Sequence, residues 1–240
     1  MAPVNTAVGS GTCTTCLHRD TAQWCALDSL HLMQVDEAKV IKDYQKGQTV
    51  YQQGEPCAGI YCVSSGTLAI RKLDADGNSI VVRLVHPGQT VGYRDYFAGE
   101  EHSTGADAVE KARVCFVPAA ALSCLIAGHP ELSLKFLETI STDLDQAETA
   151  ILQHDTLPVR VRLAHLLLSM QERYGKLDAN GRVTFSLPVS RQDIAAMLGT
   201  RPETIARTLH ALSNDNVVVV SGRTVHVPNG EMLLAEVEAF

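Results

Sequence analysis

Short apolar runs separated by glycines fill the first half of the chain. Five of the glycines between residues 46 and 117 lie 7 to 12 residues apart, at Gly47, Gly54, Gly66, Gly77 and Gly88. The segment Asp76-Gly77-Asn78 is typical of a hairpin turn. Regular short strands with turn signals at this spacing predict a small antiparallel barrel or jelly roll.

A segment without internal glycine or proline follows, from about residue 131 to residue 157, and predicts one long helix. Its seam residues recur at alternating spacings of three and four, at Leu137, Ile140, Leu144, Ala147, Ile151 and His154. This spacing is the a/d seam of a two-stranded coiled coil over about two and a half heptads. A helix that packs against its own barrel would show a broader stripe, so the seam favours a homodimer.

Residues 190–212 predict two short helices joined by a tight turn. Ser190–Asp193 and Thr200–Glu203 each match a helix capping pattern, and Gly199 lies between them. Val159–Tyr174 predicts a further helix ahead of this pair. The second helix of the pair, after Gly199, has one apolar face, with Ile205, Leu209 and Leu212 at positions i, i+4 and i+7.

The opposite face of that helix carries groups that can read DNA. Arg207 can bond bidentately to guanine, and Glu203 can accept a hydrogen bond from a cytosine amine. A solvated ion pair between these two side chains is the alternative. Two capping patterns around a glycine turn favour a helix-turn-helix, which places its second helix in the major groove. The predicted DNA contacts are Arg191, Thr200, Arg201, Glu203, Thr204, Ala206, Arg207, His210 and Arg223.

Two β-branched runs follow, Val217–Val220 and Thr224–Val227, with Gly222 and Arg223 at the turn between them. This pattern predicts a hairpin. A hairpin directly after a helix-turn-helix makes the predicted module a winged helix.

Charge and composition restrict the class of protein. The net charge is −7, but residues 156–240 carry a net +1 and residues 1–155 a net −8, so the acidic excess lies away from the predicted DNA face. No apolar run is long enough to cross a membrane and no signal peptide opens the chain, which predicts a soluble, cytoplasmic protein. No catalytic motif is present, so we do not expect an enzyme.

Seven cysteines in an intracellular chain indicate ligands, sensors or buried thiols more than disulfides. Cys13 and Cys16 lie in an arm rich in Gly, Ser and Thr, where packing in a core explains them poorly, and Cys25 follows after eight residues. Three thiolates on such a segment can hold a metal or an iron–sulfur cluster. Cys62 and Cys124 lie in apolar patterns, and we expect both to pack in the core.

A barrel, a long helix and a winged helix-turn-helix, in that order, resemble the CRP/FNR superfamily of transcription regulators over essentially the whole chain. The matching motifs are Lys46-Gly47-Gln48, Gly54-Glu55, Ser65-Gly66, His86-Pro87-Gly88-Gln89, Arg162-Leu163-Ala164, Ser190-Arg191-Gln192-Asp193-Ile194-Ala195, Leu198-Gly199 and Pro202-Glu203-Thr204-Ile205-Ala206-Arg207. The resemblance implies a homodimer that binds palindromic double-stranded DNA, contacts RNA polymerase and senses an effector through its N-terminal part.

The expected fold is therefore α+β, in four parts. They are a cysteine-containing arm at 1–30, a cyclic-nucleotide-binding-like β-barrel at 31–130, a dimerisation helix at 131–157 and a winged helix-turn-helix at 158–240. Family members with the same two residues as Glu203 and Arg207 imply half-sites with a TGA-like core.

The arm is similar to that of the oxygen-sensing FNR branch, which combines an N-terminal cysteine cluster with one cysteine late in the barrel. Cys115 matches the late cysteine. The resemblance thus implies a [4Fe–4S] cluster held by Cys13, Cys16, Cys25 and Cys115, although the spacing from Cys16 to Cys25 is longer than is common in that branch. Loss of the cluster in oxygen would release the arm and change the dimer.

Other effectors remain open. In the cyclic-nucleotide branch a Glu and an Arg hold the ligand, and here Tyr93 and His102 stand at those positions. Zinc on the arm cysteines, with His18 or Cys115, would give a structural site, and the same thiols could form a redox switch without metal.

Heme, or nitric oxide sensed through it, is a further alternative. The available imidazoles are His31, His86 and His102. His86 precedes a Pro-Gly turn and His102 lies in a polar loop, so we expect both to be solvated.

Overall fold

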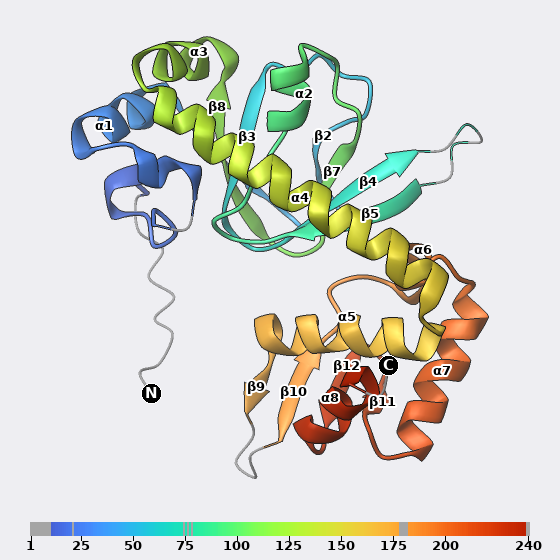
Figure 1. Cartoon of the computed structure of the whole chain (residues 1–240). Coiled ribbons are helices and arrows are strands. Elements are labelled where there is room, and N and C mark those ends of the chain that lie inside the picture. The colour runs from blue at the N-terminus through green and yellow to red at the C-terminus, as the bar shows by residue number, and fades with distance from the viewer. Residues whose placement is uncertain are drawn as a thin grey trace. The chain divides into compact units, whose positions relative to one another are not determined.

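The structure is a computed structural model of the chain (Figure 1), and it describes residues 11–20, 22–73, 75, 77, 79–177 and 182–238. The chain divides into two compact units, one of Met1–Asp76 with Arg83–Thr142 and one of Gly77–Val82 with Asp143–Phe240. Each unit buries its own set of apolar side chains.

The first unit contains two four-stranded sheets. One has the strand order β1 (Val40–Tyr44), β8 (Ala112–Pro118), β3 (Gly59–Ser65) and β6 (Thr90–Val91). The other has the order β2 (Thr49–Tyr51), β7 (Gly105–Ala108), β4 (Leu68–Leu73) and β5 (Ser79–Val85). Apolar side chains from both sheets share one core, which confirms the predicted jelly roll.

Strand β3 shows how the sequence alternation places side chains. Tyr61 and Val63 lie in the core between the sheets, whereas Ile60 and Cys62 face the opposite side. Gly66 ends the strand with φ of +78°, and an added Cβ would lie 2.3 Å from the carbonyl oxygen of Lys111. This turn therefore requires glycine.

Turns and short helices complete the sheets. The predicted hairpin turn between β4 and β5 lies partly outside the described residues, since of its three residues only Gly77 is described, with φ of +81°. The short helix α2 (Tyr93–Ala98) follows β6 and begins after Gly92.

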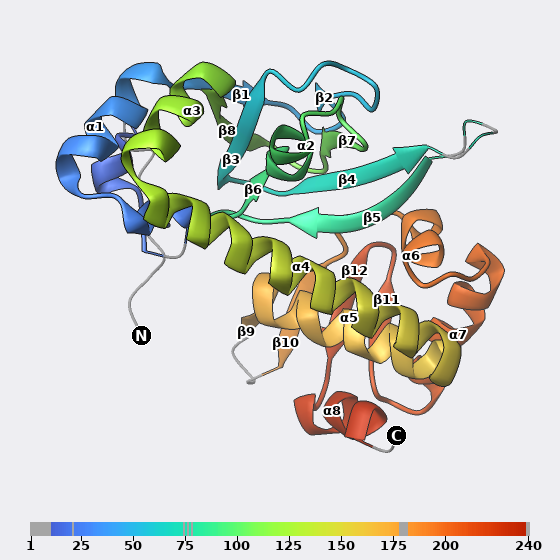
Figure 2. The same ribbon diagram turned by 45° about the horizontal axis from the view of Figure 1, so that its top comes forward.

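Helices cover the outer face of the first sheet (Figure 2). They are α1 (Ser29–Ala38), α3 (Ala119–Gly128) and the start of α4 (Pro130–Thr156). The short 3-10 turns η1 (Cys13–Thr15) and η2 (Gln23–Ala26), which precede α1 in the chain, pack against the same core. A second core lies beneath them, where Trp24, Leu32, Leu122 and Phe136 pack against Ile60 of β3. Residues 1–10 of the predicted arm lie outside the described residues.

Helix α4 runs over the segment where the sequence predicts one long helix. Its buried residues are Leu132 and Phe136, both in the first unit. Leu137, Leu144 and Ile151 are 56%, 58% and 65% exposed. The predicted seam thus leaves large apolar side chains on the surface of the single chain.

The second unit is a winged helix. Its helices are α5 (Val159–Tyr174), α6 (Arg191–Met197), α7 (Pro202–Asn214) and α8 (Gly230–Glu238). Its sheet has the order β11 (Val219–Ser221), β12 (Thr224–Val227), β10 (Val183–Ser186) and β9 (Lys176–Leu177). Arg160 of α5 bonds to Glu236 of α8 at 2.6 Å and to Asp215 at the end of α7 at 2.7 Å, so one guanidinium ties three helices together.

Candidate nucleic-acid interface and effector site

The first helix of the helix-turn-helix begins with the capping box that the sequence predicts. The Asp193 backbone N–H donates to Ser190 Oγ, and the Ser190 backbone N–H donates to Asp193 Oδ2, both at 3.0 Å. The turn after α6 is closed by Gly199, with φ of +57°, and by a hydrogen bond from the Thr200 N–H to the Ala195 carbonyl at 2.9 Å. These bonds fix where the second helix starts.

The second capping box is not formed. Helix α7 begins at Pro202, its N-cap is Arg201, and no side chain caps it. The prediction at Thr200–Glu203 was wrong because proline favours the first helical position and keeps the residue before it extended. Glu203 is therefore left exposed in the first turn of α7.

Helix α7 has the two faces that the sequence predicts. Ile205, Leu209 and Leu212 are no more than 3% exposed. Arg207 is exposed on the other face, and its Nη2 donates to Thr204 Oγ1 at 3.4 Å, one turn earlier. An open surface hollow on this face is lined by Ala206, Arg207, His210, Ala211 and Asn214.

The wing is braced against the loop that precedes α6. The Arg223 backbone carbonyl accepts a hydrogen bond from the Leu187 N–H at 2.8 Å, and the Arg223 guanidinium donates to the Leu187 carbonyl from Nε at 3.1 Å and Nη2 at 2.8 Å. The side chain is thus held in place while its remaining N–H groups stay available. Arg191 and Arg201, at the starts of α6 and α7, are exposed.

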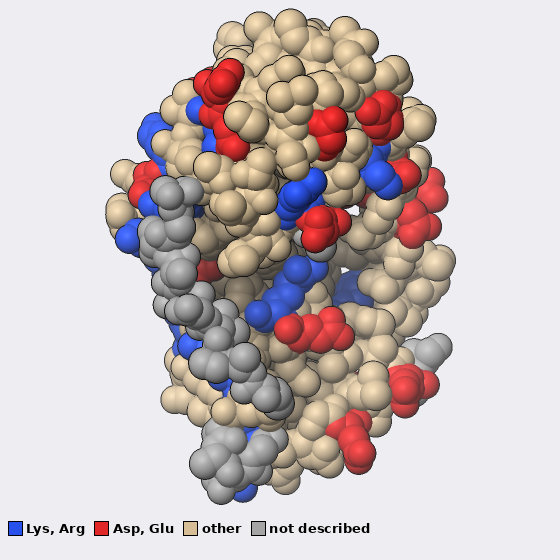
Figure 3. All heavy atoms as spheres, turned by 90° about the vertical axis from the view of Figure 1, so that its left-hand side faces the viewer, with Lys and Arg blue, Asp and Glu red and all other residues tan. Residues whose placement is uncertain are grey.

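Acidic residues outnumber basic ones in the chain, with 27 Asp and Glu and 20 Lys and Arg. On the face turned to the viewer in Figure 3, Lys and Arg are interspersed with Asp and Glu. Affinity for nucleic acid through a broad basic surface is therefore not favoured on that face, and the arginines of the winged helix are the relevant cations.

The predicted seam residues of α4 do not share one environment. Ile140 is half-buried and packs against the core of the first unit, whereas Leu144 is exposed. His154 lies against the helix-turn-helix, with Nε2 3.3 Å from the Met197 carbonyl oxygen. A Cβ at Gly199 would lie 2.6 Å from the same imidazole, so Gly199 leaves room for it.

The start of the cysteine arm, the described residues among 11–28, is held by helix α1. The Cys13 N–H donates to Asp36 Oδ1 at 2.7 Å. Lys39 Nζ donates to Asp36, to the Gly11 carbonyl at 2.6 Å and to Cys13 Sγ at 3.3 Å. Burial raises the pKa of Cys13 to about 12. Cys13 therefore does pack against a core, contrary to the expectation for such an arm.

Two further cysteines lie under the arm on neighbouring strands. Cys62 of β3 and Cys115 of β8 are cross-strand partners, so their side chains share the face that the arm covers. Burial raises the pKa of Cys62 to about 11, and the nearby Cys115 and Cys16 add to this shift. Burial also raises the pKa of Cys115, with a further contribution from Cys16. Cys16, Cys62 and Cys115 therefore lie near one another.

Cys25 lies apart from this group. It is exposed, and it contributes to the raised pKa of Lys135 on α4, for which Glu138 is the main cause. Among the described residues, no group of three or more His, Cys, Asp or Glu side chains is arranged to hold a metal ion. The donor set has the thiols that an iron–sulfur cluster needs, but Cys25 would have to turn inward.

Cys124 is exposed on α3, so the prediction of a core position was wrong.

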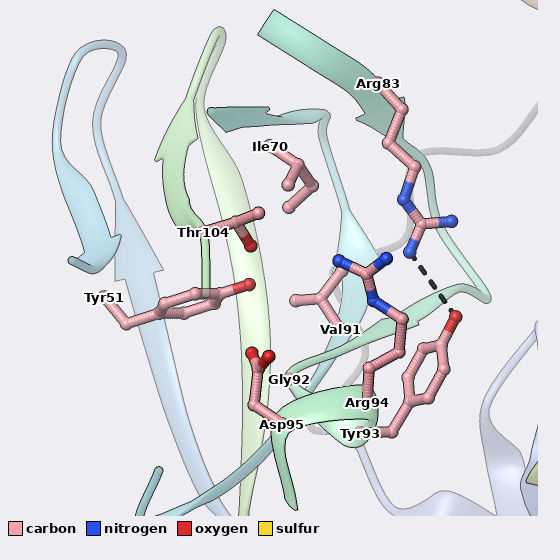
Figure 4. A pocket seen from close by; sticks show the side chains of 9 residues that line it. All are labelled: Tyr51, Ile70, Arg83, Val91, Gly92, Tyr93, Arg94, Asp95 and Thr104. Atoms are coloured by element: carbon pink, nitrogen blue, oxygen red, sulfur yellow. Dashed lines mark hydrogen bonds between the residues drawn. The ribbon is translucent and has the colours of Figure 1, made fainter. Parts of the chain in front are cut away.

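The jelly roll contains a small cavity of about 10 Å³. Figure 4 shows the guanidinium groups of Arg83 and Arg94 beside it, and Arg83 Nη2 donates to the Tyr93 hydroxyl at 3.5 Å. The other side chains around it include Tyr51, Asp95 and Thr104. Ligand pockets for molecules of nucleotide size have volumes of ~300–1,000 Å³, whereas this cavity has room for about one water. The pocket is closed to a cyclic nucleotide in this conformation.

His102, which replaces the expected Arg, helps to close that region. It is 2% exposed, its Nδ1 lies 3.2 Å from Asp95 Oδ2, and its ring stacks on Tyr51 with centroids 4.0 Å apart. The expectation of solvated imidazoles was wrong here and at His86, which is 9% exposed. Tyr51, which is distant in sequence, covers the His102 ring, and local polarity does not reveal this. His31 is bonded through Nδ1 to Asp28 at 2.7 Å.

Comparison with known proteins identifies the family. The profile of the cyclic nucleotide-binding domain matches residues 41–129, and the profile of the Crp-like helix-turn-helix domain matches residues 161–236. The chain belongs to the CRP/FNR family of transcription regulators. It is thus a DNA-binding regulator and, as the sequence predicts, not an enzyme.

Relatives of this CRP/FNR regulator include proteins named for anaerobic control. The anaerobic regulatory protein of Pasteurella multocida is 27% identical over 225 residues, covering 92% of this chain and 82% of that protein. The fumarate and nitrate reduction regulatory protein of Vibrio cholerae is 26% identical over 237 residues, covering 97% and 94%. The solved structure of FixK2 from Bradyrhizobium japonicum matches with a TM-score of 0.71 and 26% identity, covering 82% of this chain and 96% of that one.

No helix in the described part of the regulator is long and apolar enough to cross a membrane.

Sequence reasoning did not find Asp36, Lys39, Gln23 or Trp24 as residues that hold the cysteine arm in place. The spacing of Asp36 and Lys39 at i and i+3 in a helix, and a tryptophan directly before Cys25, were the available signals.

Proposed function

We propose that this regulator acts as a cytoplasmic homodimer that binds palindromic double-stranded DNA and changes its DNA affinity with oxygen or redox state. The observation that carries the proposal is the two-faced helix α7, which buries Ile205, Leu209 and Leu212 and exposes Glu203 and Arg207. RNA polymerase is the further partner that a regulator bound beside a promoter would contact.

Sequence reading would come from α7 in the major groove. Arg207 would donate to guanine O6 and N7, Glu203 would accept from a cytosine amine and Ala206 would contact a thymine methyl. This set of contacts favours half-sites with a TGA-like core. Phosphate contacts would position the module without adding specificity. We assign them to Arg191, Thr200, Arg201, Thr204, His210 and Arg223.

The exposed stripe on α4 supports the dimer. Leu137, Leu144 and Ile151 recur every seven residues, and each is more than half exposed in the single chain. Covering such side chains with a second copy removes apolar surface from water. Two copies of α7 would then be held about one turn of DNA apart, which a palindromic operator requires.

The redox proposal depends on the cysteine arm and on the relatives named for anaerobic and fumarate–nitrate regulation. We propose Cys13, Cys16, Cys25 and Cys115 as the ligands of a [4Fe–4S] cluster. When bound, such a cluster would supply an oxygen-labile cross-link between arm and barrel. Lys39 and Asp36 would hold the start of the arm, and Cys25 would leave its exposed position near Lys135.

Anaerobic purification, followed by iron, sulfide and zinc counts and an ultraviolet–visible spectrum, tests the effector. We expect a brown protein with about four irons and four sulfides per chain. A colourless zinc protein or a sharp Soret band would replace the cluster with zinc or heme. A selection from random duplexes tests the DNA proposal separately, and recovery of no palindrome would refute it.

A further inference from the structure

Two buried residues of the cysteine arm connect it to helix α4. Gln23 is 9% exposed, and its side chain amide makes two hydrogen bonds in opposite directions. Its Nε2 donates to Thr139 Oγ1 of α4 at 2.9 Å. Its Oε1 accepts from Thr90 Oγ1 of β6 at 2.7 Å. One side chain therefore bridges the barrel and the long helix.

Trp24 makes a second bridge between the same two parts. It is 6% exposed, and its Nε1 donates to Cys62 Sγ of β3 at 3.1 Å. Its ring meets Phe136 of α4 edge-on, with centroids 6.3 Å apart. An aromatic pair of this kind and a buried hydrogen bond both depend on a fixed ring position.

Both bridging residues share the four-residue turn η2 with Cys25. The turn η2 is closed by hydrogen bonds from the Cys25 N–H to the Ala22 carbonyl and from the Leu27 N–H to the Trp24 carbonyl, at 3.1 and 3.0 Å. A 3-10 turn has about three residues per turn, so three consecutive side chains point in different directions. Gln23 and Trp24 point into the core while Cys25 points outward.

This geometry couples the position of Cys25 to the position of α4. Bringing Cys25 inward toward Cys16 and Cys115 requires η2 to rotate or unwind. Either movement displaces Gln23 and Trp24 from their partners on α4. Those partners, Thr139 and Phe136, flank the exposed Leu137 on the same helix.

We propose that Gln23 and Trp24 are positioning residues that transmit the state of the cysteine arm to the start of the exposed stripe on α4. The inference rests on the proposed role of the arm as the sensor. The link itself exists in the chain without any cofactor, so it can be tested separately from oxygen sensing.

The chain offers a matched pair of α4 variants for this test. Thr139→Val keeps the β-branched shape and removes the acceptor for Gln23, together with the bond from Thr139 Oγ1 to the Lys135 carbonyl. Thr142→Val, one turn later, removes only the equivalent bond to the Glu138 carbonyl, within the helix. The difference between the two variants therefore isolates the contact with the arm.

Amide hydrogen exchange on the cofactor-free full chain measures the link. In Thr139→Val we expect the Cys25 and Leu27 amides of η2 to exchange about 2- to 12-fold faster than in Thr142→Val, the effect of losing one net hydrogen bond. The reciprocal variant Gln23→Leu should speed exchange in residues 136–142 of α4 by a similar factor, because coupling acts in both directions. Equal η2 exchange in the two threonine variants would overturn the link.

The emission of Trp24, the only tryptophan, gives a second readout. We expect its maximum to shift to the red in Thr139→Val and not in Thr142→Val. In the cluster-loaded protein, we compare operator affinity before and after exposure to air. The ratio of these two affinities should fall toward one in Thr139→Val and should keep its wild-type value in Thr142→Val. Identical ratios in both variants would exclude Gln23 and Trp24 from the signal. A wild-type ratio of one would instead refute oxygen sensing, and the exchange data would still decide the link.

Discussion

Replacing Leu144 by alanine tests the proposed dimer at the middle of the exposed stripe. Leu144 is 58% exposed, and full burial of a leucine contributes about 1.5–3 kcal/mol. Covering the exposed part would therefore contribute ~0.9–1.7 kcal/mol per protomer. A two-fold interface uses each residue twice, so the dimer gains ~1.7–3.5 kcal/mol from this position.

Alanine retains little of that surface, and it has the highest helix propensity, so α4 itself should remain folded. We expect the dimer dissociation constant of Leu144→Ala to rise by about 20- to 300-fold. Sedimentation equilibrium over a range of protein concentrations measures this constant directly. Circular dichroism of the same samples checks that helix content is unchanged.

Leu152 supplies the control, because it is 62% exposed on the same helix but lies outside the seam. Leu152→Ala removes the same atoms from an equally exposed position. We expect it to change the dissociation constant by less than about threefold, within the range of ordinary surface substitutions. If both variants weaken the dimer equally, or neither does, the seam is not the interface.

Three further outcomes are expected. Arg207→Ala should lose ~1–3 kcal/mol of specific operator binding and relax the preference for guanine at the position that Arg207 contacts. Fluorescence anisotropy on matched and mismatched duplexes measures both effects. Arg191→Ala, by contrast, should weaken binding to both duplexes by the same factor. Alkylation at pH 8 followed by mass spectrometry should label the exposed Cys25 and Cys124 well before Cys13 and Cys62. Burial raises the pKa of Cys13 to about 12 and that of Cys62 to about 11, which leaves little thiolate on either residue at pH 8. Early labelling of Cys13 would mean that the arm opens readily in solution. Millimolar cyclic AMP should leave the melting temperature unchanged, because the jelly-roll cavity of about 10 Å³ cannot admit it without rearrangement, and a clear upward shift would contradict this reading.

Local patterns determined much of this fold. The helix Val159–Tyr174, the capping box at Ser190 and Asp193 and the buried face of α7 follow the sequence prediction. Each depends on residues within a few positions of one another, where helical and strand periodicity and capping chemistry act directly. The capping prediction failed at the start of α7, because proline overrode the capping pattern.

The surroundings of the candidate effector residues depended on tertiary structure. Cys62 meets Cys115 through the register of β3 and β8, and His102, in the loop before β7, is covered by Tyr51 of β2. Such contacts join segments far apart in the chain, and periodicity carries no information about their register or packing. The sequence by itself determined a winged helix, a jelly roll and an arm of cysteines. The tertiary structure alone decided that Gln23 and Trp24, and not Cys25, face the core, because a short turn can point only part of its side chains inward.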